Sequence, residues 1–428
     1  MGQLEEFLHD RIQQFETLRS LHASDASWRA SEQNKTRLSF RDFALNFERF
    51  MDLIGPALKS GGYNLGPARR ATIFTDKPRT IYRFSWPDTF VMAHLARALA
   101  ATVEPQMSNA LFSYRSGRGS VQALERLARF LRQNKAPFFV CRRDIRHFGE
   151  SLRHEFVRAD FQKFGSTNPD LVSLIDRICR FEYEDGGACI QNQRGLPTGA
   201  YLQLVFENLY LSALDHELDC LSASTYVRFG DDLIFLTTDF KQAELARATI
   251  ERFVAERGLE LNPEKSAFFC LQPPALRGFR DAAGVEVRST FRHLGLVVDW
   301  RGEISLPSDK LKKLQKLIKA RIARSAALLP KDSSIEERAV ILIETAKNLL
   351  YDTFAISDNP IATYLGYCRS REQLRALDRW VAMLILKFAV QGGFKAANFR
   401  KISFKRLRQL GLPSVQHMRN KHEFPIRY

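Results

Sequence analysis

The chain has 428 residues, of which 45% are hydrophobic, and its formal net charge at pH 7 is +16. This length favours two or three domains, or one large multi-lobed unit, and the composition is that of a soluble globular protein with a substantial core. The 64 Lys and Arg residues are spread through the sequence and are not collected in one tail. We therefore expect a polyanionic partner, because basic proteins bind phosphate backbones largely by releasing counterions.

The sequence shows no sign of a disulfide framework, a zinc site or a membrane segment. The N-terminus lacks the basic-then-apolar layout of a signal peptide, and the apolar run from Trp380 to Val390 is too short to span a bilayer. The six cysteines are scattered, without a C-x-x-C pair, at positions 141, 179, 189, 220, 270 and 368. We therefore expect a cytoplasmic protein with no membrane association.

The first 70 residues are predicted to form a helical extension that is interrupted at Gly61-Gly62. Residues 71–85 have an extended pattern. Residues 120–133 are predicted to form an amphipathic helix, because their apolar side chains recur on one helical face. A short apolar strand, "PFFVCRRDI", follows at residues 137–145 and ends in charged side chains.

The middle of the chain alternates between helical and extended patterns. Residues 200–221 have the 3-and-4 apolar spacing of a helix. The stretch "STYVRFGDDLIFLTT" predicts two strands joined by a tight turn, in which Gly230 can adopt a positive φ. A helix over residues 241–258 is predicted next, followed by the strands "LELN" and "SAFFCL".

These elements predict an α+β fold in which helices cover one face of a sheet. Beyond residue 306 the pattern is helical throughout. One helix over residues 310–329 carries a basic face, and a second begins at Ser334 with a capping box to Glu337. We therefore place a domain boundary near residue 306.

Two adjacent aspartates, Asp231 and Asp232, lie at the turn between the two predicted strands. Like charges this close destabilise a sheet turn unless a cation neutralises them. Mg²⁺ prefers carboxylate oxygens and keeps positions open for phosphates. Asp144, at the end of another strand, supplies a third carboxylate, and such a set would hold two ions about 3.5–4 Å apart for phosphoryl transfer. A solvated Asp-Asp turn is the simpler interpretation of the dipeptide alone.

Six segments, in order, resemble the motifs of bacterial reverse transcriptases, the group with group II intron, retron, diversity-generating and abortive-infection enzymes. They span residues 108–298 and are "SNALFSYRSGRGSVQAL", "DIRHFGESL", "RGLPTGAYLQLVFENLYLSALD", "RFGDDLIF", "LELNPEKSAFF" and "FRHLGLVV". The resemblance implies a right-hand polymerase and RNA-directed DNA polymerase activity. Fingers and palm, with an antiparallel palm sheet packed on helices, would occupy residues 71–306. An N-terminal helical extension would occupy residues 1–70, and a helical thumb and C-terminal extension residues 307–428.

The same resemblance implies roles for individual residues. Asp144 and Asp231 would bind Mg²⁺ or Mn²⁺, with the Ile145 carbonyl completing one shell, and Asp232 would assist as a third carboxylate at the metals or orient the primer. Lys265 would act near the leaving pyrophosphate. Residues expected to bind the nucleotide are Lys77, Arg79, Arg83, Arg115, Ile145, Phe148, Gly149, Pro197, Thr198, Gly199 and Asn208. Residues expected to bind nucleic acid are Arg194, Gln203, His293, Leu294, Gly295, Lys312, Lys313 and Lys316. Surface lysines and a solvated helix face are the alternative interpretation of the basic residues.

Three positions depart from the family pattern. Most relatives carry an aromatic residue five positions after the first aspartate, which blocks a 2′-hydroxyl; here Gly149 stands there and Phe148 precedes it. We expect weakened sugar discrimination, or a gate rebuilt by Phe148. Thr198 replaces the usual Gln of the turn, with Gln203-Leu204 in place of Ser-Pro, and Phe229-Gly230 replaces Tyr-Ala in the hairpin.

These departures resemble the unknown-group and abortive-infection branches, and no maturase, endonuclease or RNase H signature follows the thumb. We therefore expect a stand-alone bacterial enzyme used in defence against phage, which copies a dedicated non-coding RNA or extends without an ordinary template. Its partners would be RNA, the DNA product, dNTPs, and a second copy or a sister subunit. Two alternatives remain: an RNA-directed RNA polymerase, which also uses a Gly-Asp-Asp hairpin, and a catalytically inactive RNA-binding protein.

Overall fold

The computed structural model describes residues 3–24, 39–60, 62–74, 78–274, 284–330, 332–355 and 365–417. The chain divides into two compact units that interleave along the sequence. Unit 1 comprises Met1–Gly119 and Phe139–Phe269, and unit 2 comprises Ser120–Phe138 and Cys270–Tyr428. This division does not follow the boundary expected near residue 306, because an internal helix belongs to the C-terminal unit.

The N-terminal extension of unit 1 is helical. Its helices are α1 (Gln3–His9), α2 (Arg11–Ser24), α4 (Phe40–Leu45) and α5 (Phe47–Lys59). They pack on α6 (Trp86–Val103) through polar and aromatic contacts. Thr17 Oγ1 lies 2.9 Å from His94 Nδ1, and the rings of Phe47 and Phe90 are 5.1 Å apart. The extension therefore shares its core with the rest of unit 1.

A four-stranded sheet has the order β2-β1-β4-β5. Its strands are β1 (Ala68–Phe74), β2 (Pro78–Arg83), β4 (Glu182–Asp185) and β5 (Ala188–Gln191). β1 pairs antiparallel with β2 and parallel with β4. The extended pattern expected over residues 71–85 is therefore a hairpin, and helices α8 (Phe148–Ser151), α9 (His154–Phe164) and α10 (Pro169–Cys179) precede β4.

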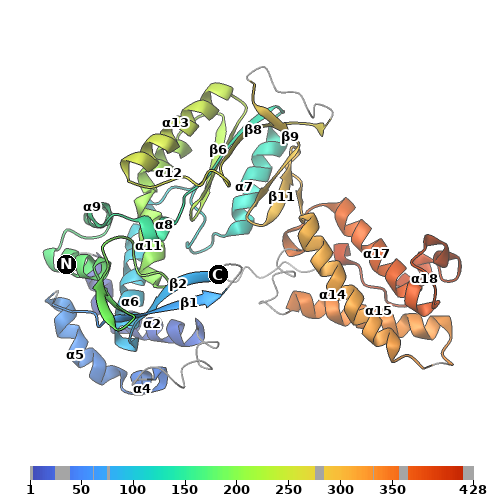
Figure 1. Ribbon diagram of the computed structural model, residues 1–428, viewed down its shortest axis with the longest axis horizontal. Coiled ribbons are helices and arrows are strands. Elements are labelled where there is room, and N and C mark those ends of the chain that lie inside the picture. Colours follow the sequence, from blue (N-terminus) through green and yellow to red (C-terminus); the bar gives the residue numbers. More distant parts are fainter. Residues whose placement is uncertain are drawn as a thin grey trace. The chain divides into compact units, whose positions relative to one another are not determined.

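The second sheet has the order β6-β7-β3-β8-β9. Its strands are β3 (Phe138–Asp144), β6 (Ser224–Phe229), β7 (Asp232–Thr237), β8 (Ala267–Leu271) and β9 (Glu286–Arg288). β7 pairs antiparallel with both β6 and β3, as expected for a palm sheet. Figure 1 shows helices α12 (Ser212–Asp219) and α13 (Phe240–Glu256) alongside the strands that they contact, β6 and β7. The predicted α+β class is confirmed.

Two predicted elements differ from the structure. The helix expected over residues 200–221 is interrupted at Leu211, which separates α11 (Tyr201–Tyr210) from α12. One cause is visible: the guanidinium of Arg228 donates to the carbonyl oxygen of Asn208 at 3.0 Å, so this oxygen is drawn out of the regular helical ladder. The stretch "LELN" forms a single bridge, Ile145↔Leu261, and no strand.

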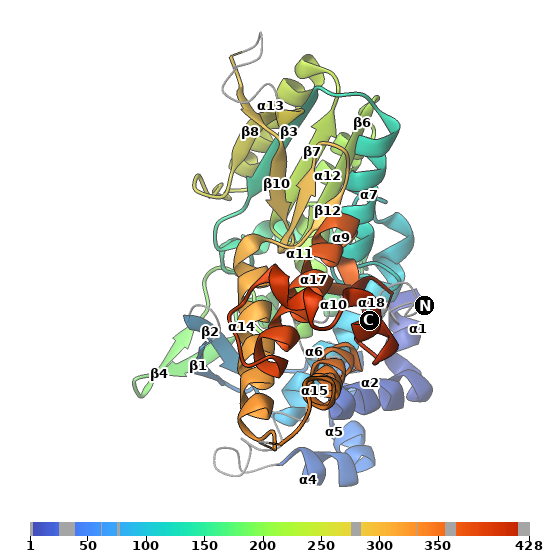
Figure 2. The same ribbon diagram turned by 90° about the vertical axis from the view of Figure 1, so that its right-hand side faces the viewer.

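Unit 2 combines helices with a small sheet of order β10-β11-β12. Its remaining elements are α7 (Ser120–Gln133), β10 (Thr290–His293), β11 (Leu296–Asp299), β12 (Ile304–Ser305), α14 (Ser308–Ala327), α15 (Ile335–Ala355), α17 (Arg371–Ala389) and α18 (Phe404–Gln409). Figure 2 shows α14, α15 and α17 packed beside one another. Across the described residues, no helix combines the length and apolarity needed to cross a bilayer.

Candidate active site

The turn between β6 and β7 consists of Gly230 and Asp231, because Phe229 pairs with Asp232. Gly230 has φ +64°, in the left-handed region that glycine adopts without steric cost. Both polar groups of Gly230 are held: its N–H donates to Ser113 Oγ at 2.9 Å, and its carbonyl accepts from the guanidinium of Arg228 at 3.3 Å. The position of Asp231 is thus fixed from the side of the protein core.

The strand register brings the carboxylates to one end of the sheet. Asp144, the last residue of β3, lies opposite Asp232, the first residue of β7. The backbone N–H of Ile145 donates to the carbonyl oxygen of Asp231 at 3.0 Å. Burial raises the pKa of Asp231, and the charges of Asp144 and Asp232 raise this pKa further. The side chains are therefore close enough for electrostatic repulsion between them to matter.

Two of the three carboxylates have a cationic partner. Lys265 Nζ lies 2.9 Å from Asp144 Oδ2, and Arg142 contacts Asp232 through two hydrogen bonds of 3.1 Å. Within the described residues no group of three Asp, Glu, His or Cys side chains is arranged around a common metal position. Asp144 and Asp231 offer the hard oxygen donors that Mg²⁺ requires. Asp232 pairs with Arg142, and its expected place among the metal ligands stays a prediction.

Lys265 reaches Asp144 because the segment after α13 pairs with the end of β3. Asn262 donates its backbone N–H to the Asp144 carbonyl at 2.7 Å, and Arg146 donates to the Glu260 carbonyl at 2.8 Å. The hydrogen bond to Asp144 raises the pKa of Lys265, which keeps the ammonium protonated. The structure therefore places this lysine at the Asp144 carboxylate, and its expected role near the leaving pyrophosphate stays a prediction.

A buried polar network lies beneath the hairpin turn. Arg228 and Asp215 are both fully buried and form a bidentate pair, with Nε and Nη2 of Arg228 within 2.7–3.0 Å of the two carboxylate oxygens. Asn208 joins this network, because its amide donates to the Ser113 carbonyl at 3.0 Å and its Oδ1 accepts from the Ser113 hydroxyl at 3.2 Å. Asn208 is 5% exposed. It therefore supports the turn and does not face a nucleotide, contrary to our expectation.

Two further expectations for nucleotide contacts are corrected by burial. The guanidinium of Arg115 is bound by the Glu104 carboxylate at 2.8 Å and by the carbonyl of Ser108 at 2.6 Å, so it is unavailable to phosphates. Phe148 is 5% exposed and packs edge-on against Tyr210. It cannot rebuild a gate from inside the core.

The space above Gly149 is filled by a pair of polar side chains from α11. A Cβ at position 149 would lie 1.9 Å from Gln203 Nε2 and 2.5 Å from Glu207 Oε1. Gln203 Nε2 donates to Glu207 Oε1 at 2.7 Å, and Gln203 Oε1 accepts from the Gly199 N–H at 3.3 Å. Position 149 must therefore be glycine while this pair stays in place. Gln203 is buried in the same pair, which argues against its expected contact with nucleic acid.

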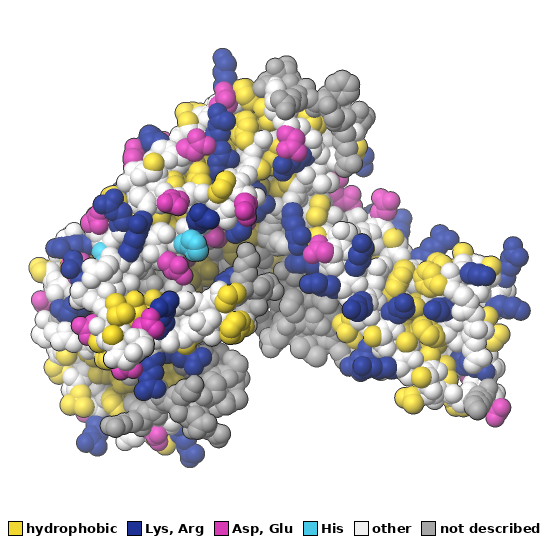
Figure 3. All heavy atoms as spheres, viewed as in Figure 1, with side chains coloured by type: hydrophobic (Ala, Val, Ile, Leu, Met, Phe, Trp, Pro, Cys, Tyr) yellow, Lys and Arg dark blue, Asp and Glu magenta, His cyan; other side chains and the backbone are white. Residues whose placement is uncertain are grey.

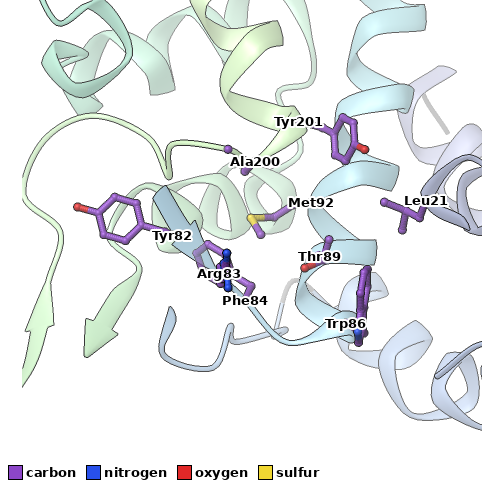
Figure 4. A pocket seen from close by; sticks show the side chains of 10 residues that line it. Leu21, Tyr82, Arg83, Phe84, Trp86, Thr89, Met92, Ala200 and Tyr201 are labelled. Atoms are coloured by element: carbon purple, nitrogen blue, oxygen red, sulfur yellow. The ribbon is translucent and has the colours of Figure 1, made fainter. Parts of the chain in front are cut away.

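The turn before α11 is held close to other backbone segments. Gly195 has φ +76°, and a Cβ there would lie 2.7 Å from the backbone of Glu150. Thr198 accepts a hydrogen bond from the Tyr82 N–H at 3.1 Å. A cavity of about 150 Å³ adjoins the turn, and Figure 4 shows Tyr82, Arg83 and Tyr201 around it. Arg83 and Gly199, which were predicted separately, line the same cavity.

The remaining predicted residues lie on exposed or separate elements. Arg79 is exposed on β2. Lys77 lies outside the described residues. In unit 2, Leu294 and Gly295 form the turn of the β10–β11 hairpin, with φ values of +46° and +76°, and His293 pairs with Leu296 beside them. Figure 3 shows Lys and Arg side chains gathered over α14, where Lys312, Lys313 and Lys316 are exposed.

Three features of the site were not anticipated from sequence. Tyr114 lies near Asp231 and Glu207, because the charges of both raise its pKa beyond the effect of burial. Glu207 and the Arg228–Asp215 pair lie within helical or strand patterns that predict packing and give no sign of a polar network. A charged residue at an otherwise apolar position of α11, α12 or β6 is the only signal that would have drawn attention to them.

Glu207 leads to a test of stability against pH. Burial raises its pKa to about 7 from the ordinary 4.5, the Gln203 hydrogen bond opposes this, and the charge of Asp231 adds to it. The folded state then holds a proton that the unfolded state has lost between pH 4.5 and 7, so stability falls as pH rises through this window. We expect Glu207→Gln to remove this loss, with a gain that grows from near zero at pH 4.5 to roughly 3 kcal/mol at pH 8.

Urea unfolding followed by circular dichroism across this pH range measures the effect. Glu256→Gln, at the exposed end of α13, is the control and should follow the wild type at every pH. A difference between Glu207→Gln and the wild type that is constant with pH would show that the pKa of Glu207 is not raised in the folded protein.

The middle of the chain matches a known protein family. A family model described as "Reverse transcriptase (RNA-dependent DNA polymerase)" matches residues 77–298. No curated protein sequence matches the chain. Among solved structures, telomerase from Candida albicans in complex with a TWJ fragment of telomeric RNA is similar at 11% identity, over 89% of this chain and 68% of that chain, with a TM-score of 0.45.

Telomerase from Candida tropicalis is similar in two structures. Apo telomerase has 11% identity over 81% of this chain and 69% of that chain, with a TM-score of 0.44. A form truncated from the C-terminal domain has 10% identity over 64% of this chain and 62% of that chain, with a TM-score of 0.43. The chain thus spans about two thirds of the length of these telomerase chains.

The matched residues, 77–298, make up more than half of the chain and include the β6–β7 hairpin, Asp144, the turn before α11 and Lys265. The chain therefore belongs to the reverse transcriptase family, whose activity is RNA-directed DNA polymerisation.

Proposed function

We propose that this chain adds dNTPs to a 3′-hydroxyl with Mg²⁺ held by Asp144 and Asp231. The observation that supports this most directly is the meeting of the two carboxylates at one end of the β3–β7 pair, where burial and like charge raise the pKa of Asp231. Bound Mg²⁺ or Mn²⁺ would supply neutralisation of phosphate oxygens and activation of the attacking hydroxyl. The Ile145 carbonyl, next to Asp144 in the chain, would complete this donor set.

The chain's own residues would position the substrates. Arg79 and Arg83, on β2, suit bidentate contact with a triphosphate, and Arg83 lines the cavity at the Gly199 turn. Pro197, Thr198 and Gly199 would let the backbone approach the incoming nucleotide. Lys265, held at Asp144, would remain protonated and close to the leaving pyrophosphate. The exposed lysines of α14 would contact the phosphates of a bound duplex, and the β10–β11 hairpin would hold the primer.

Substitution of Asp231 tests the polymerase mechanism. Asp231→Asn keeps the shape of the turn and removes one charge, and we expect primer extension on an RNA template to fall by at least about 10³-fold, the equivalent of about 4 kcal/mol of transition-state stabilisation. Glu256→Gln, which removes an exposed charge, should retain full activity. Extension by Asp231→Asn at a rate within tenfold of the wild type would rule out this role for the carboxylate.

Sugar selection is the second test. Gly149 carries no side chain, and Phe148 is buried, so no ring blocks a 2′-hydroxyl from these two positions. We expect ribonucleotides to be used within about 10²-fold of deoxynucleotides, because a site that lacks an aromatic ring at these positions rejects an added hydroxyl only weakly. Incorporation kinetics with matched dNTP and NTP pairs measure this ratio. Rejection beyond about 10⁴-fold that persists in Phe148→Leu would contradict the proposal, and use of NTPs without dNTPs would indicate an RNA-directed RNA polymerase.

We further propose that the enzyme belongs to the prokaryotic lineage of stand-alone, defence-associated reverse transcriptases. The substitutions at Thr198, Gln203-Leu204 and Phe229-Gly230 support this placement. The high positive charge supports a dedicated non-coding RNA partner, bound together with a second copy or a sister subunit. We expect the purified protein to carry one discrete RNA, identified by sequencing the bound nucleic acid with and without dNTPs. Nucleic-acid-free protein with full activity on any primer-template would contradict this.

A further inference from the structure

A second cavity in unit 1, of about 530 Å³, is lined mainly by charged side chains. The cavity lies between the start of α9 and the end of α10. The segment before the 195–199 turn and Gly258, which follows α13, complete its lining. The charged residues that line it are Arg153, Glu155, Arg158, Asp176, Arg180 and Arg194. Four arginines therefore share one hollow with two carboxylates.

The two carboxylates are already neutralised. Glu155 forms an ion pair with Arg153, and Asp176 forms an ion pair with Arg158 at 3.2 Å. Arg194 donates Nε to the Ser151 carbonyl at 2.9 Å and Nη2 to the Gly258 carbonyl at 2.5 Å, so its partners are neutral backbone groups.

Arg180 has no such partner. In the part of the chain that the structure describes, its side chain makes no ion pair or hydrogen bond. Its charge is felt at the neighbouring His154, whose pKa is lowered mainly by burial and further by Arg180. Together with Arg194, it leaves two positive charges in this cavity uncompensated.

The lining determines the class of ligand. Apart from the imidazole of His154, no aromatic or aliphatic side chain lines the cavity, so it offers little surface on which a nucleobase would stack. Guanidinium groups match phosphate oxygens in geometry and charge, and they bind them in bidentate fashion. The volume is that of a pocket for a drug-sized ligand, which suits two or more linked phosphates.

The cavity adjoins both segments that carry proposed substrate contacts. Arg194 directly precedes Gly195, whose carbonyl accepts from His154 Nε2 at 2.9 Å, and this segment continues into the Pro197–Gly199 turn. Gly258 lies two residues before Glu260, which pairs with Arg146 beside the metal carboxylate. A ligand in the cavity would therefore contact the backs of both segments.

We propose that this cavity is a phosphate-binding site, separate from the Asp144–Asp231 pair, that holds linked phosphates without contacting bases. The phosphates belong to the backbone of single-stranded RNA or to a free polyphosphate. The choice of RNA as one source rests on the proposed function, whereas the site itself follows from the arginines.

The test uses the full chain in EDTA, so that no divalent metal bridges a ligand to the carboxylates. Arg180→Glu is the informative variant, because among the described residues this side chain makes no ion pair or hydrogen bond that the substitution would break. Arg129→Glu, an exposed arginine of α7 with the same change in charge, is the matched control. Calorimetric titration with tripolyphosphate and fluorescence anisotropy with a labelled ten-nucleotide oligouridylate give the two affinities.

We expect Arg180→Glu to weaken tripolyphosphate binding at least about tenfold more than Arg129→Glu does, because it reverses a charge inside the cavity. If RNA is the source, its affinity falls in parallel, and the slope of log affinity against log salt decreases by about 1. If only tripolyphosphate is affected, the site serves a free polyphosphate. Equal behaviour of the two variants with both ligands overturns the proposal.

The same samples separate this inference from the proposed function. Wild-type protein that does not extend primers but binds phosphates in an Arg180-dependent way leaves the site standing and removes the polymerase assignment. Wild-type protein that extends primers normally, but whose phosphate binding does not depend on Arg180, keeps the polymerase assignment and removes the proposed phosphate site.

Discussion

The site depends on holding like charges together at the end of two paired strands. Asp144, Asp231 and Asp232 repel one another, and the ion pairs of Lys265 with Asp144 and of Arg142 with Asp232 relieve only part of this repulsion. The hairpin turn is held from the side of the core, where Arg228 forms a buried ion pair with Asp215 and also donates to the carbonyl of Gly230. Removing one member of such a pair typically costs about 3–5 kcal/mol, because the other charge is left uncompensated. The hairpin turn is therefore supported by charge as well as by packing.

The same network accounts for the architecture around the turn. The side-chain amide of Asn208 donates to Ser113, and its backbone carbonyl accepts from Arg228. Helix α11 ends two residues later. Glu207, next to it, is drawn into the buried pair with Gln203 that covers Gly149. Polar side chains thus occupy positions that a simple amphipathic helix would give to Leu or Phe. These polar side chains contribute less to core stability than apolar ones would, but their hydrogen bonds define the geometry around the carboxylates.

Sequence patterns predicted the elements of the site better than its side-chain contacts. Asp144 and the Gly230 turn were predictable because each lies at the end of an apolar strand, where alternation fixes the direction of the chain. Arg115, Phe148 and Asn208 were misassigned, since their partners are Glu104, Tyr210 and Ser113. The last two lie 62 and 95 residues away in the chain, and Glu104 lies in a different element. No local pattern indicates such partners. The missed Arg228–Asp215 pair has the same cause, because burial of a charge is a property of the folded core.

Helix α7 has a consequence for how the chain can be divided. It belongs to the same unit as the C-terminal helices, and Glu125 accepts hydrogen bonds from both Arg132 within α7 and Arg369 before α17. These bonds lower the pKa of Glu125 although burial opposes them. Gly302 packs against the Ala128 backbone so closely that no side chain would fit there. A fragment that starts at residue 307 would lack α7 and Gly302, so the apolar surface that these segments cover in unit 2 would be exposed. Neither recombination nor proteolysis at that point would therefore release an intact module.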